Sequence, residues 1–488
     1  MTGATSVPAV SRSSPVSESS LPGVNLVGFL EGELGLGEVA RKLGRGFERA
    51  GAPFAAISYR RTPSRQGHAT EIPISDEAPY DTNVICLNAD YLQTFLADAG
   101  VDFFAGRYSI GVWFWESNVF RPENMEGFRF VDEVWVASEY VRRAIAAESD
   151  VPVHVVPLPI EAPLGPARSR ADLELPDGFM FLFVFDFVSA QRKNPTAVVK
   201  AFKRAFRPGE GPVLVLKGMN GRERKPQWLD GLIAATEGRP DIHVVDAYVS
   251  AEERDALIAS CDCYVSLHRS EGFGLTMAEA MARGKPVIAT GYSGNREFMD
   301  DRNSYIVPHR LVPVPDDWWA YAPGAEWADP DVVAAAALMR EVYENPTEAR
   351  ARGERGRESI LSTMSLEQTA MFLSGRMSAI RKRRGAVRRP PDAETRAPIL
   401  SASHELGKGV GASLAASPGA RGIVRRLLVK ALWPYLEEQH RVNAMTLDAL
   451  ATLQRSVDDL SQRVAELEGS LVSPGESGSV EEGRARTP

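Results

Sequence analysis

The stretch Ser266-Leu-His-Arg-Ser-Glu-Gly-Phe-Gly-Leu-Thr-Met-Ala-Glu-Ala-Met281 joins a strand-like run to a helix-like run through a glycine turn. The apolar run 264–267 is typical of a buried strand, and a helix is expected to open near Leu275. Such a turn lets backbone N–H groups approach a phosphate, and the helix dipole favours an anion there. The stretch therefore predicts an α/β unit with an anion site at the end of a strand.

Two carboxylates flank this predicted anion site. Glu271 precedes the turn and Glu279 lies one turn inside the expected helix, so both can face one ligand. A carboxylate is a good acceptor for the diol of a ribose or a sugar. A solvated pair of glutamates at a helix start is the alternative, and a bare pair would favour it. Because a strand, a Gly-Phe-Gly turn and a helix accompany the pair, we expect a ligand with phosphates and hydroxyls.

The alternation of strands and helices extends along most of the chain. Strands are predicted at 24–30, 84–87, 110–115, 134–137 and 153–156, and again at 179–187, 213–217, 243–245, 264–267 and 287–290. A helical pattern lies at 38–50, and Asn194 before Pro195 predicts a helix start with Asn194 as its N-cap. We therefore expect two facing, doubly wound parallel-sheet units, with a seam near 160–175 and a cleft at the carboxyl ends of their strands.

The stretch 266–281 resembles the E-x7-E signature of the retaining, GT-B-fold nucleotide-sugar glycosyltransferases of family 4. The segment from Gly284 to Asn295 is similar to the strand and glycine loop that follow in that family. The resemblance extends over residues 24–380 and is strongest over 180–310. It implies a GT-B fold, in which two Rossmann-like α/β domains face each other. It also implies transfer of a sugar from a nucleotide-diphosphate donor with retention of the anomeric configuration.

The resemblance implies roles for individual residues. Glu271 would approach the donor sugar, Glu279 would bind the ribose, and the backbone of the glycine turn would bind the sugar and the phosphates. The donor-binding residues expected on this basis are Glu279, Gly272, Phe273, Gly274, Leu275, Thr276, His268, Lys217 and Gly294. Among them, Lys217 is a reserve cation at a strand end. His268 is equally compatible with a buried histidine whose hydrogen bonds are satisfied within the protein.

Two adjacent cations, Arg192 and Lys193, follow the predicted strand 179–187. Adjacent cations at a helix start repel each other and gain nothing from the dipole, so they need an anionic partner, which a diphosphate would supply. The family usually has an arginine soon after this strand and a lysine a few residues later, whereas Asp186 occupies the first place here. We expect Arg192, Lys193 and Glu271 to be the catalytic residues; an exposed basic pair is the alternative.

Two further segments are candidates for the acceptor side of the cleft. The glycine-rich loop 31–38 follows a strand and precedes a helix, and its acids Glu31 and Glu33 suit a hydroxyl better than a pyrophosphate; a tight structural turn is the alternative. The Trp-Phe-Trp-Glu run at 113–116 offers aromatic faces and a carboxylate to a sugar; core packing of its tryptophans is the alternative. The acceptor-binding residues expected are Gly35, Gly37, Glu33, Trp115 and Glu116.

Composition and charge narrow the function further. With 56 Lys and Arg against 64 Asp and Glu, the 488-residue chain has a net charge of −8, which disfavours a dedicated nucleic-acid binder. Three cysteines make no disulfide framework and favour a reducing cytosol. No run reaches the ~18 apolar residues that span a bilayer.

The D-x-D triplet at 329–331 is expected to cap a helix at Val332. We expect no metal and no cofactor besides the nucleotide sugar.

The end of the chain has a different pattern. Apolar residues between 450 and 471 recur at spacings of 3 and 4, which predicts a coiled coil and self-association. Residues 421–433 set cations beside an apolar group, which predicts binding to a membrane surface or docking on a protein.

The stretch 316–327 is expected to be a long loop. We predict a disordered leader at 1–22, an N-terminal acceptor domain at 23–165, a C-terminal donor domain at 166–346, helices at 347–384 that return to the first domain, a linker at 385–420, a basic amphipathic helix at 421–438, a coiled coil at 439–472 and a disordered tail at 473–488.

Together these features predict a hexosyltransferase that moves a sugar from a nucleotide-diphosphate donor to a hydroxyl of a glycan or lipid-linked glycan. Assembly of a cell-envelope polysaccharide or glycolipid is the expected setting. The expected location is the cytoplasm, with peripheral contact at the inner face of the membrane as an open alternative. The expected partners are donor, acceptor and a second copy of the chain, with no nucleic acid. The alternatives are a non-hydrolysing sugar-nucleotide epimerase of the same fold, a glycan phosphorylase and a non-catalytic coiled-coil scaffold.

Overall fold

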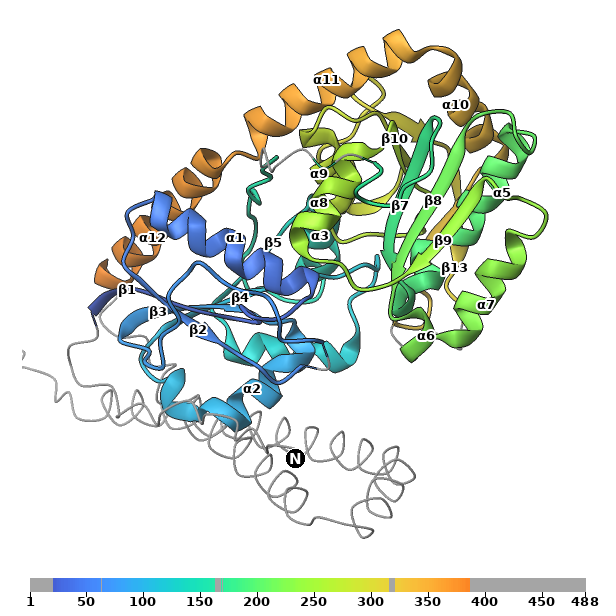
Figure 1. Ribbon diagram of the computed structural model, residues 1–488. Coiled ribbons are helices and arrows are strands. Elements are labelled where there is room, and N and C mark those ends of the chain that lie inside the picture. The colour runs from blue at the N-terminus through green and yellow to red at the C-terminus, as the bar shows by residue number, and fades with distance from the viewer. Residues whose placement is uncertain (1–20, 63, 163–167, 169, 316–320, 387–488) are drawn as a thin grey trace, which may run out of the picture. The chain divides into compact units, whose positions relative to one another are not determined.

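The computed structural model describes residues 21–62, 64–162, 168, 170–315 and 321–386, which lie in one compact unit, 1–393. Two six-stranded parallel sheets, one in each half of this unit, form its framework (Figure 1). The predicted basic helix, coiled coil and tail lie outside the described residues. So do the leader up to residue 20 and the linker from residue 387. Residues 21 and 22, expected in the leader, begin the first strand.

The first sheet has the strand order β2-β1-β3-β4-β5-β6. Its strands are β1 (Leu21–Gly28), β2 (Phe54–Ser58), β3 (Tyr80–Cys86), β4 (Tyr108–Val112), β5 (Glu133–Val136) and β6 (Val153–Val155), joined through α1 (Gly35–Arg49), α2 (Leu92–Ala99), α3 (Glu139–Ala146) and the short helices η1 (Ala89–Tyr91), η2 (Val101–Phe103) and η3 (Pro122–Phe130). In α1 the buried Val39, Leu43 and Phe47 recur every four residues. This spacing places them on one face, which packs on the sheet.

The second sheet has the strand order β12-β11-β10-β7-β8-β9. Its strands are β7 (Met180–Asp186), β8 (Val213–Met219), β9 (Ile242–Asp246), β10 (Cys263–Ser266), β11 (Val287–Thr290) and β12 (Tyr305–Val307), joined through η4 (Phe187–Ser189), α4 (Ala190–Lys193), α5 (Pro195–Ala205), α6 (Gly221–Arg224), α7 (Pro226–Ala235), α8 (Ala251–Ser260), α9 (Leu275–Ala282) and η5 (Ser293–Glu297). The central strand β7 is apolar on both faces because helices cover both sides of the sheet. The prediction of two doubly wound units is confirmed.

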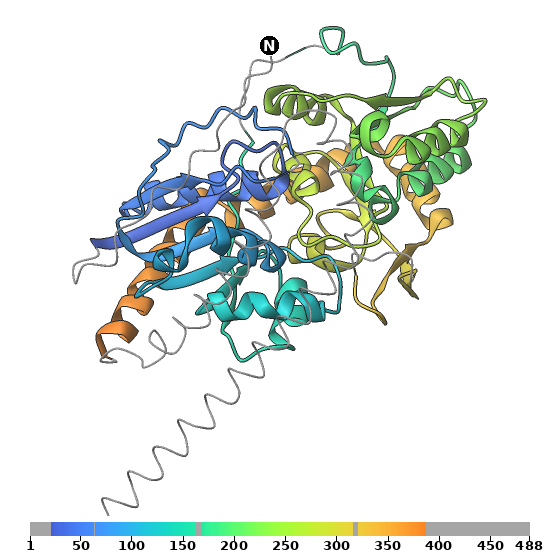
Figure 2. The same ribbon diagram turned by 90° about the horizontal axis from the view of Figure 1, so that it is seen from below.

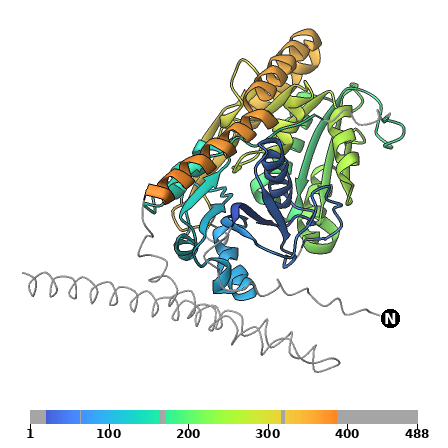
Figure 3. The ribbon, with the colours of Figure 1, turned by 90° about the vertical axis from the view of Figure 1, so that its left-hand side faces the viewer.

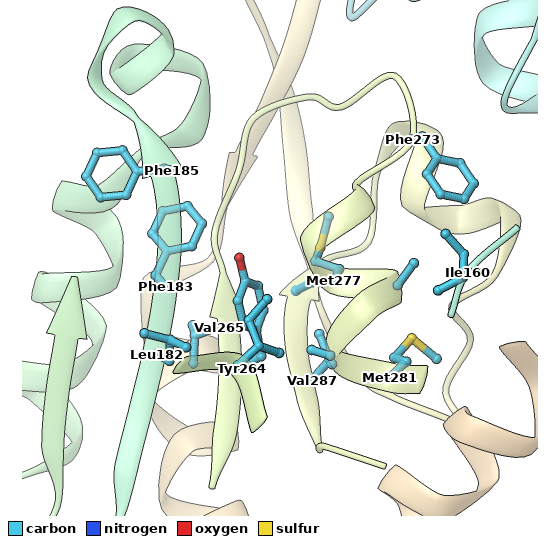
Figure 4. Packing of buried hydrophobic residues seen from close by; sticks show 14 of the residues in the cluster. Ile160, Leu182, Phe183, Phe185, Tyr264, Val265, Phe273, Met277, Met281 and Val287 are labelled. Carbon is cyan, nitrogen blue, oxygen red and sulfur yellow. The ribbon is translucent and has the colours of Figure 1, made fainter. Parts of the chain in front are cut away.

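The core of the second half lies between its central strands and α9. Met277 and Met281 lie on the side of α9 that faces Tyr264 of β10 and Val287 of β11 (Figure 4). All four side chains are at most 1% exposed. Because the interior is close-packed, the position of α9, and with it the start of that helix at Leu275, is fixed by this packing.

The last described helices return from the second half to the first. They are α10 (Val332–Glu344), α11 (Pro346–Thr363) and α12 (Leu366–Ala386). Figure 3 shows α11 and α12 running along both halves, and α12 lies beside α1. Phe372 of α12 packs edge-on against Trp135 of β5, and Arg376 forms a double ion pair with the fully buried Glu133. The helix therefore completes the core of the first half.

Two local expectations differ from the structure. The end of the stretch 316–327 is not a loop, because β14 (Glu326–Pro330) pairs antiparallel with β13 (His309–Pro313); this hairpin is part of the second half (Figure 2). The richness of the stretch in proline and alanine concealed the strand. Asn194 does precede the helix α5, but its side chain makes no cap. Its amide instead donates to the carbonyl of Leu267, 3.0 Å away, and so ties α5 to the loop after β10.

Candidate functional site

A cleft of about 710 Å³ lies where the two sheets present the carboxyl ends of their strands. In each sheet the strand order reverses at one place, between β1 and β3 in the first and between β7 and β10 in the second. At such a point the loops that follow the two neighbouring strands leave toward opposite faces of the sheet. Ligands of doubly wound sheets bind in the crevice between these loops. The loops after these four strands all contribute residues to the lining of the cleft. The topology thus brings both halves of the expected site together.

Glu271 lies in the loop after β10 and is 6% exposed. Its N–H donates to Ser293 Oγ, and its carbonyl accepts from the N–H of Gly294, both at 2.8 Å. A Cβ on Gly294 would lie 2.2 Å from the carbonyl oxygen of Gly272, so only glycine lets the two loops approach this closely. Gly294 therefore fixes the backbone of Glu271 but does not line the cleft.

Both predicted catalytic cations contact the Glu271 carboxylate. Arg192 Nη1 lies 3.0 Å from Oε2, and Lys193 Nζ lies 2.6 Å from Oε1. Burial on its own would raise the pKa of Glu271, but the two cations outweigh it and lower the pKa to about 2. The carboxylate is therefore ionised at every physiological pH. The sequence left open an exposed basic pair, whereas Arg192 is only 8% exposed and both cations line the cleft.

Glu279 lines the other end of the same loop–helix unit. It lies on α9, is 4% exposed, and its Oε2 atom has no hydrogen-bond partner among the described residues. Its carboxylate forms an ion pair with Arg254 of α8, whose Nη2 lies 3.8 Å from Oε1. A buried carboxylate oxygen without a partner is costly unless a ligand supplies a donor. A ribose diol supplies two, which is the role expected for Glu279.

Between the two glutamates the start of α9 faces the cleft. Gly274 adopts a left-handed conformation (φ 98°), and the helix begins at the next residue, Leu275. The first N–H groups of a helix have no partner within it, so they are available to an anion. Phe273 packs against Phe298 with only 2% of its surface exposed, so the backbone is what it offers to the cleft. Thr276 Oγ1 accepts from the hydroxyl of Tyr264.

Lys217 lies at the cleft near the end of β8. Its ammonium donates to the carbonyl oxygens of Gly218, 2.8 Å away, and of Ala247. Burial lowers its pKa to about 8, while Asp246 and Glu253 oppose this shift. The group is therefore charged at neutral pH and becomes neutral in mildly basic solution.

Some predicted donor and acceptor residues do not line the cleft. His268 is fully buried between Ser266 Oγ and Asn295 Oδ1, each 3.1 Å from a ring nitrogen, and burial lowers its pKa. This matches the alternative of a histidine satisfied within the protein. Gly37 is buried inside α1, and Trp115 donates to the carbonyl of Val119.

The acceptor half of the cleft contains Glu33, Gly35 and Glu116 of the residues predicted for it. Glu116 forms an ion pair with one of the predicted catalytic cations, since its Oε1 lies 3.5 Å from Arg192 Nη2. Glu31, the other acid of the first loop, is instead held by Arg60 at 2.7 Å and by Ser58 at 2.7 Å. Glu116 thus connects the first half to the cations of the second.

Sequence reasoning missed several residues that line the cleft. Asn88 follows β3 at the reversal point of the first sheet, and its Oδ1 accepts from the N–H of Phe114. Arg41 of α1 donates to the carbonyls of Leu30 and Gly32 and so shapes the loop after β1. The position of Asn88 after an apolar strand was a usable signal. No sequence signal pointed to Arg41, because it lies inside a helix.

The D-x-D triplet behaves as expected. Asp331 is the N-cap of α10 and accepts from the N–H groups of Val333 and Ala334. Within the part of the chain that the structure describes, no cluster of three or more His, Cys, Asp or Glu side chains could hold a metal ion. In the same part, no helix combines the length and apolar character needed to cross a membrane.

Part of the chain is similar to known proteins. Residues 168–359 match the family model described as Glycosyl transferases group 1. A curated relative, D-inositol 3-phosphate glycosyltransferase of Arthrobacter sp. (strain FB24), is 31% identical over 216 residues. This match covers 43% of the chain and 45% of the relative, so the chain spans less than half of that protein's length.

Two solved structures share the fold. Sucrose-phosphate synthase of Thermosynechococcus elongatus aligns with a TM-score of 0.54 at 17% identity, over 75% of this chain and 100% of that one. HepE of Anabaena, in complex with UDP and glucose, aligns with a TM-score of 0.53 at 14% identity, over 74% of this chain and 100% of that one. These alignments confirm the GT-B arrangement expected from the sequence. The family match extends over residues 168–359, so this part of the chain is similar to the glycosyl transferases group 1 family.

Proposed function

We propose that the protein is a glycosyltransferase that moves a sugar from a nucleotide-diphosphate-sugar to a hydroxyl of an acceptor glycan or lipid-linked glycan, with retention of the anomeric configuration. The single observation that carries this proposal is the arrangement of Glu271 and Glu279 on either side of the α9 N-terminus. One carboxylate is bound by two cations, and the other, which also lines the cleft, has a buried oxygen with no hydrogen-bond partner among the described residues. A diphosphate between a ribose and a sugar matches this order of groups.

The residues then have separate tasks. Glu279 accepts from the ribose hydroxyls, and the first N–H groups of α9 bind the diphosphate. Lys193 and Lys217 add positive charge where the diphosphate leaves, which stabilises the transition state. Glu271 accepts from hydroxyls of the donor sugar and holds Arg192 and Lys193 in place. No protein nucleophile is required if the bond from the sugar to the diphosphate breaks first and leaves an oxocarbenium-like state. The acceptor oxygen then bonds to the anomeric carbon on the face that the diphosphate leaves, and its proton passes to an oxygen of the leaving phosphate.

The donor is the first thing to test. Calorimetric titration with UDP-, GDP-, ADP- and dTDP-sugars, followed by NMR of the product formed, would give the donor and the anomeric outcome. UDP-glucose is the first probe because HepE was crystallised with UDP and glucose. Inositol 3-phosphate belongs among the acceptors because the curated relative is named for it. Failure of the wild-type protein to bind any nucleotide sugar would contradict the proposal and favour a scaffold.

The same measurements separate the other candidates. An epimerase would convert the nucleotide sugar without an acceptor, and a phosphorylase would need inorganic phosphate and no nucleotide. We further propose that transfer needs no metal, since the cations and the α9 N-terminus can neutralise the diphosphate. Undiminished turnover in EDTA is then the expected result. A loss of turnover that Mg²⁺ or Mn²⁺ restores would contradict it.

A further inference from the structure

The hairpin β13–β14 is an element of the second half for which the proposed function so far has no use. Its strand β14 is fixed to the loop that carries the catalytic acid. Arg269, two residues before Glu271, lies over the ring of Trp327 at 5.3 Å and forms an ion pair with Asp329 at 3.2 Å. The N–H of Ala328 donates to the carbonyl of Arg269 at 2.8 Å. The hairpin therefore moves with the Glu271 loop.

The same hairpin also contacts the first half. The N–H of Glu326 donates to Asn118 Oδ1 at 2.9 Å. Tyr321, which comes just before β14, packs edge-on against Trp115 with ring centroids 6.0 Å apart. On its other side Tyr321 packs against Trp327 at 6.3 Å. The ring thus lies between an aromatic residue of each half, next to the acceptor side of the cleft.

The hydroxyl of Tyr321 lies within interaction range of the Arg192 guanidinium. Burial raises the pKa of this hydroxyl, so it stays protonated and neutral in the working range of an enzyme. In a hydrogen bond between the two groups, Arg192 is the donor and the phenolic oxygen the acceptor, because a guanidinium has donors only. The hairpin therefore places a neutral acceptor beside the buried cation of the cleft.

Arg192 is surrounded by acceptors from three directions. Its Nη1 donates to the carbonyl of Ser270 at 2.8 Å and lies 3.0 Å from Glu271 Oε2, while Nη2 lies 3.5 Å from Glu116 Oε1. The two carboxylates belong to opposite halves, Glu116 to the first and Glu271 to the second. A planar guanidinium with donors in fixed directions can serve both only in one orientation. Tyr321 supplies the further contact that selects this orientation.

We infer that Tyr321 is a positioning residue, which holds Arg192 between Glu271 and Glu116 and so aligns the donor and acceptor sides of the cleft for transfer. This inference rests on the proposed function. Lys193 has a more exposed side chain than Arg192, pairs with Glu271 and lines the cleft, where it can meet the diphosphate. Loss of the Tyr321 hydroxyl should therefore affect the transfer step and leave donor binding nearly unchanged.

The test is Tyr321→Phe, which removes one oxygen and keeps the ring between Trp115 and Trp327. The matched control is Tyr343→Phe, because Tyr343 packs against Phe179 and Phe206 away from the cleft. We expect kcat to fall about tenfold in Tyr321→Phe, which corresponds to one lost hydrogen bond to a charged group. The Kd of the donor should stay within about twofold, and the control should match the wild type. An unchanged kcat, or equal losses in kcat and donor affinity, would overturn the inference.

A second readout does not depend on turnover. Hydrogen exchange of the backbone should become faster in Tyr321→Phe around residues 187–194 and 114–118, which carry Arg192 and Glu116, and should be unchanged in Tyr343→Phe. Equal exchange in both variants would overturn the positioning role. If the wild-type protein transferred no sugar, the proposed function would fail, while the exchange measurement would still decide whether Tyr321 orders the two segments.

Discussion

Glu271 is the residue on which two cations of the cleft converge. Replacing it by Gln keeps the size of the side chain but removes the charge that Arg192 and Lys193 neutralise. We expect kcat to fall at least 100-fold in Glu271→Gln, because the neutral amide no longer orients the cations and accepts fewer hydrogen bonds from the sugar. Steady-state kinetics with the donor found by titration would measure it. Glu348→Gln, an exposed acid on α11, is the matched control. Wild-type turnover in Glu271→Gln would contradict the assigned role.

Lys217 gives the cleft a pH dependence. Burial lowers its pKa to about 8, so the ammonium loses its proton as the pH rises through that value. An anion binds the charged form, and donor affinity should therefore weaken above pH 8, approaching tenfold in Kd per pH unit. Calorimetric titration between pH 7 and 9.5 would measure it. Lys217→Arg stays charged in this range and should give a flat profile. A wild-type Kd that does not change up to pH 9.5 would show that Lys217 makes no contact with the diphosphate.

At the scale of residues, the sequence predicted those parts of the site that lie close together in the chain. Glu271, the glycine turn and Glu279 form one loop–helix unit, and local spacing fixes their relation. Arg254 and Tyr321 could not be found in this way, because the fold brings them to the cleft or close to it from distant parts of the chain. His268 was ambiguous for another reason: only the positions of Ser266 and Asn295 decide whether its ring nitrogens are satisfied.

At the scale of elements, α12 has a defined stabilising contact. Arg376 forms a double ion pair with Glu133, which is fully buried and also accepts from Trp135 Nε1 at 2.6 Å. Removing one partner of a buried pair leaves an uncompensated charge, which costs about 3–5 kcal/mol. We expect Arg376→Met to lose about this much free energy of unfolding, as measured by urea denaturation.

Two further variants check that expectation. Arg381→Met, which changes an exposed residue of the same helix, should cost less than about 1 kcal/mol. Adding Glu133→Gln to Arg376→Met should recover part of the loss, because a neutral amide is cheaper to bury than an unpaired carboxylate. Equal stability of Arg376→Met and Arg381→Met would mean that the pair does not hold α12 on the first sheet.

Elements were predictable where their apolar pattern was strong. Strand β7, with Phe, Leu and Val at nearly every position, was predicted almost to its ends. Strand β2 was missed because Phe54–Ser58 is short and contains two alanines and a serine. The hairpin β13–β14 was missed because its strands carry Pro, Arg, Asp and Glu, and their pairing depends on contacts with Arg269 and the first half. Propensity carries no information about such contacts.

At the scale of the whole molecule, the proposed catalytic unit and the C-terminal segment are expected to have separate tasks. The heptad pattern at 450–471 predicts self-association, and this remains a proposal because those residues lie outside the described ones. We expect a chain that ends at Ala386 to keep its kcat with a small soluble acceptor, since every residue of the cleft precedes this position. Light scattering after gel filtration should show a smaller assembly than for the full chain. An unchanged assembly would place the contact within residues 1–386.

The same truncation tests membrane contact. The basic segment 421–433 predicts that the full chain sediments with vesicles containing anionic lipid and that the shorter chain does not. Sedimentation of both, or of neither, would contradict this prediction.

The contact between α12 and the first sheet also has a consequence for the order of events during synthesis. Glu133 and its partner Arg376 are 243 residues apart in the chain. At an elongation rate of ~5–20 residues per second, Glu133 leaves the ribosome roughly 10–50 s before Arg376 does. Once β6 has also emerged, for most of this interval, the nascent first half has every strand of its sheet but lacks the helix that covers Trp135 and neutralises Glu133. Its unfinished surface is thus exposed for as long as the second half is being made, and this is when a nascent chain of this design most needs a chaperone.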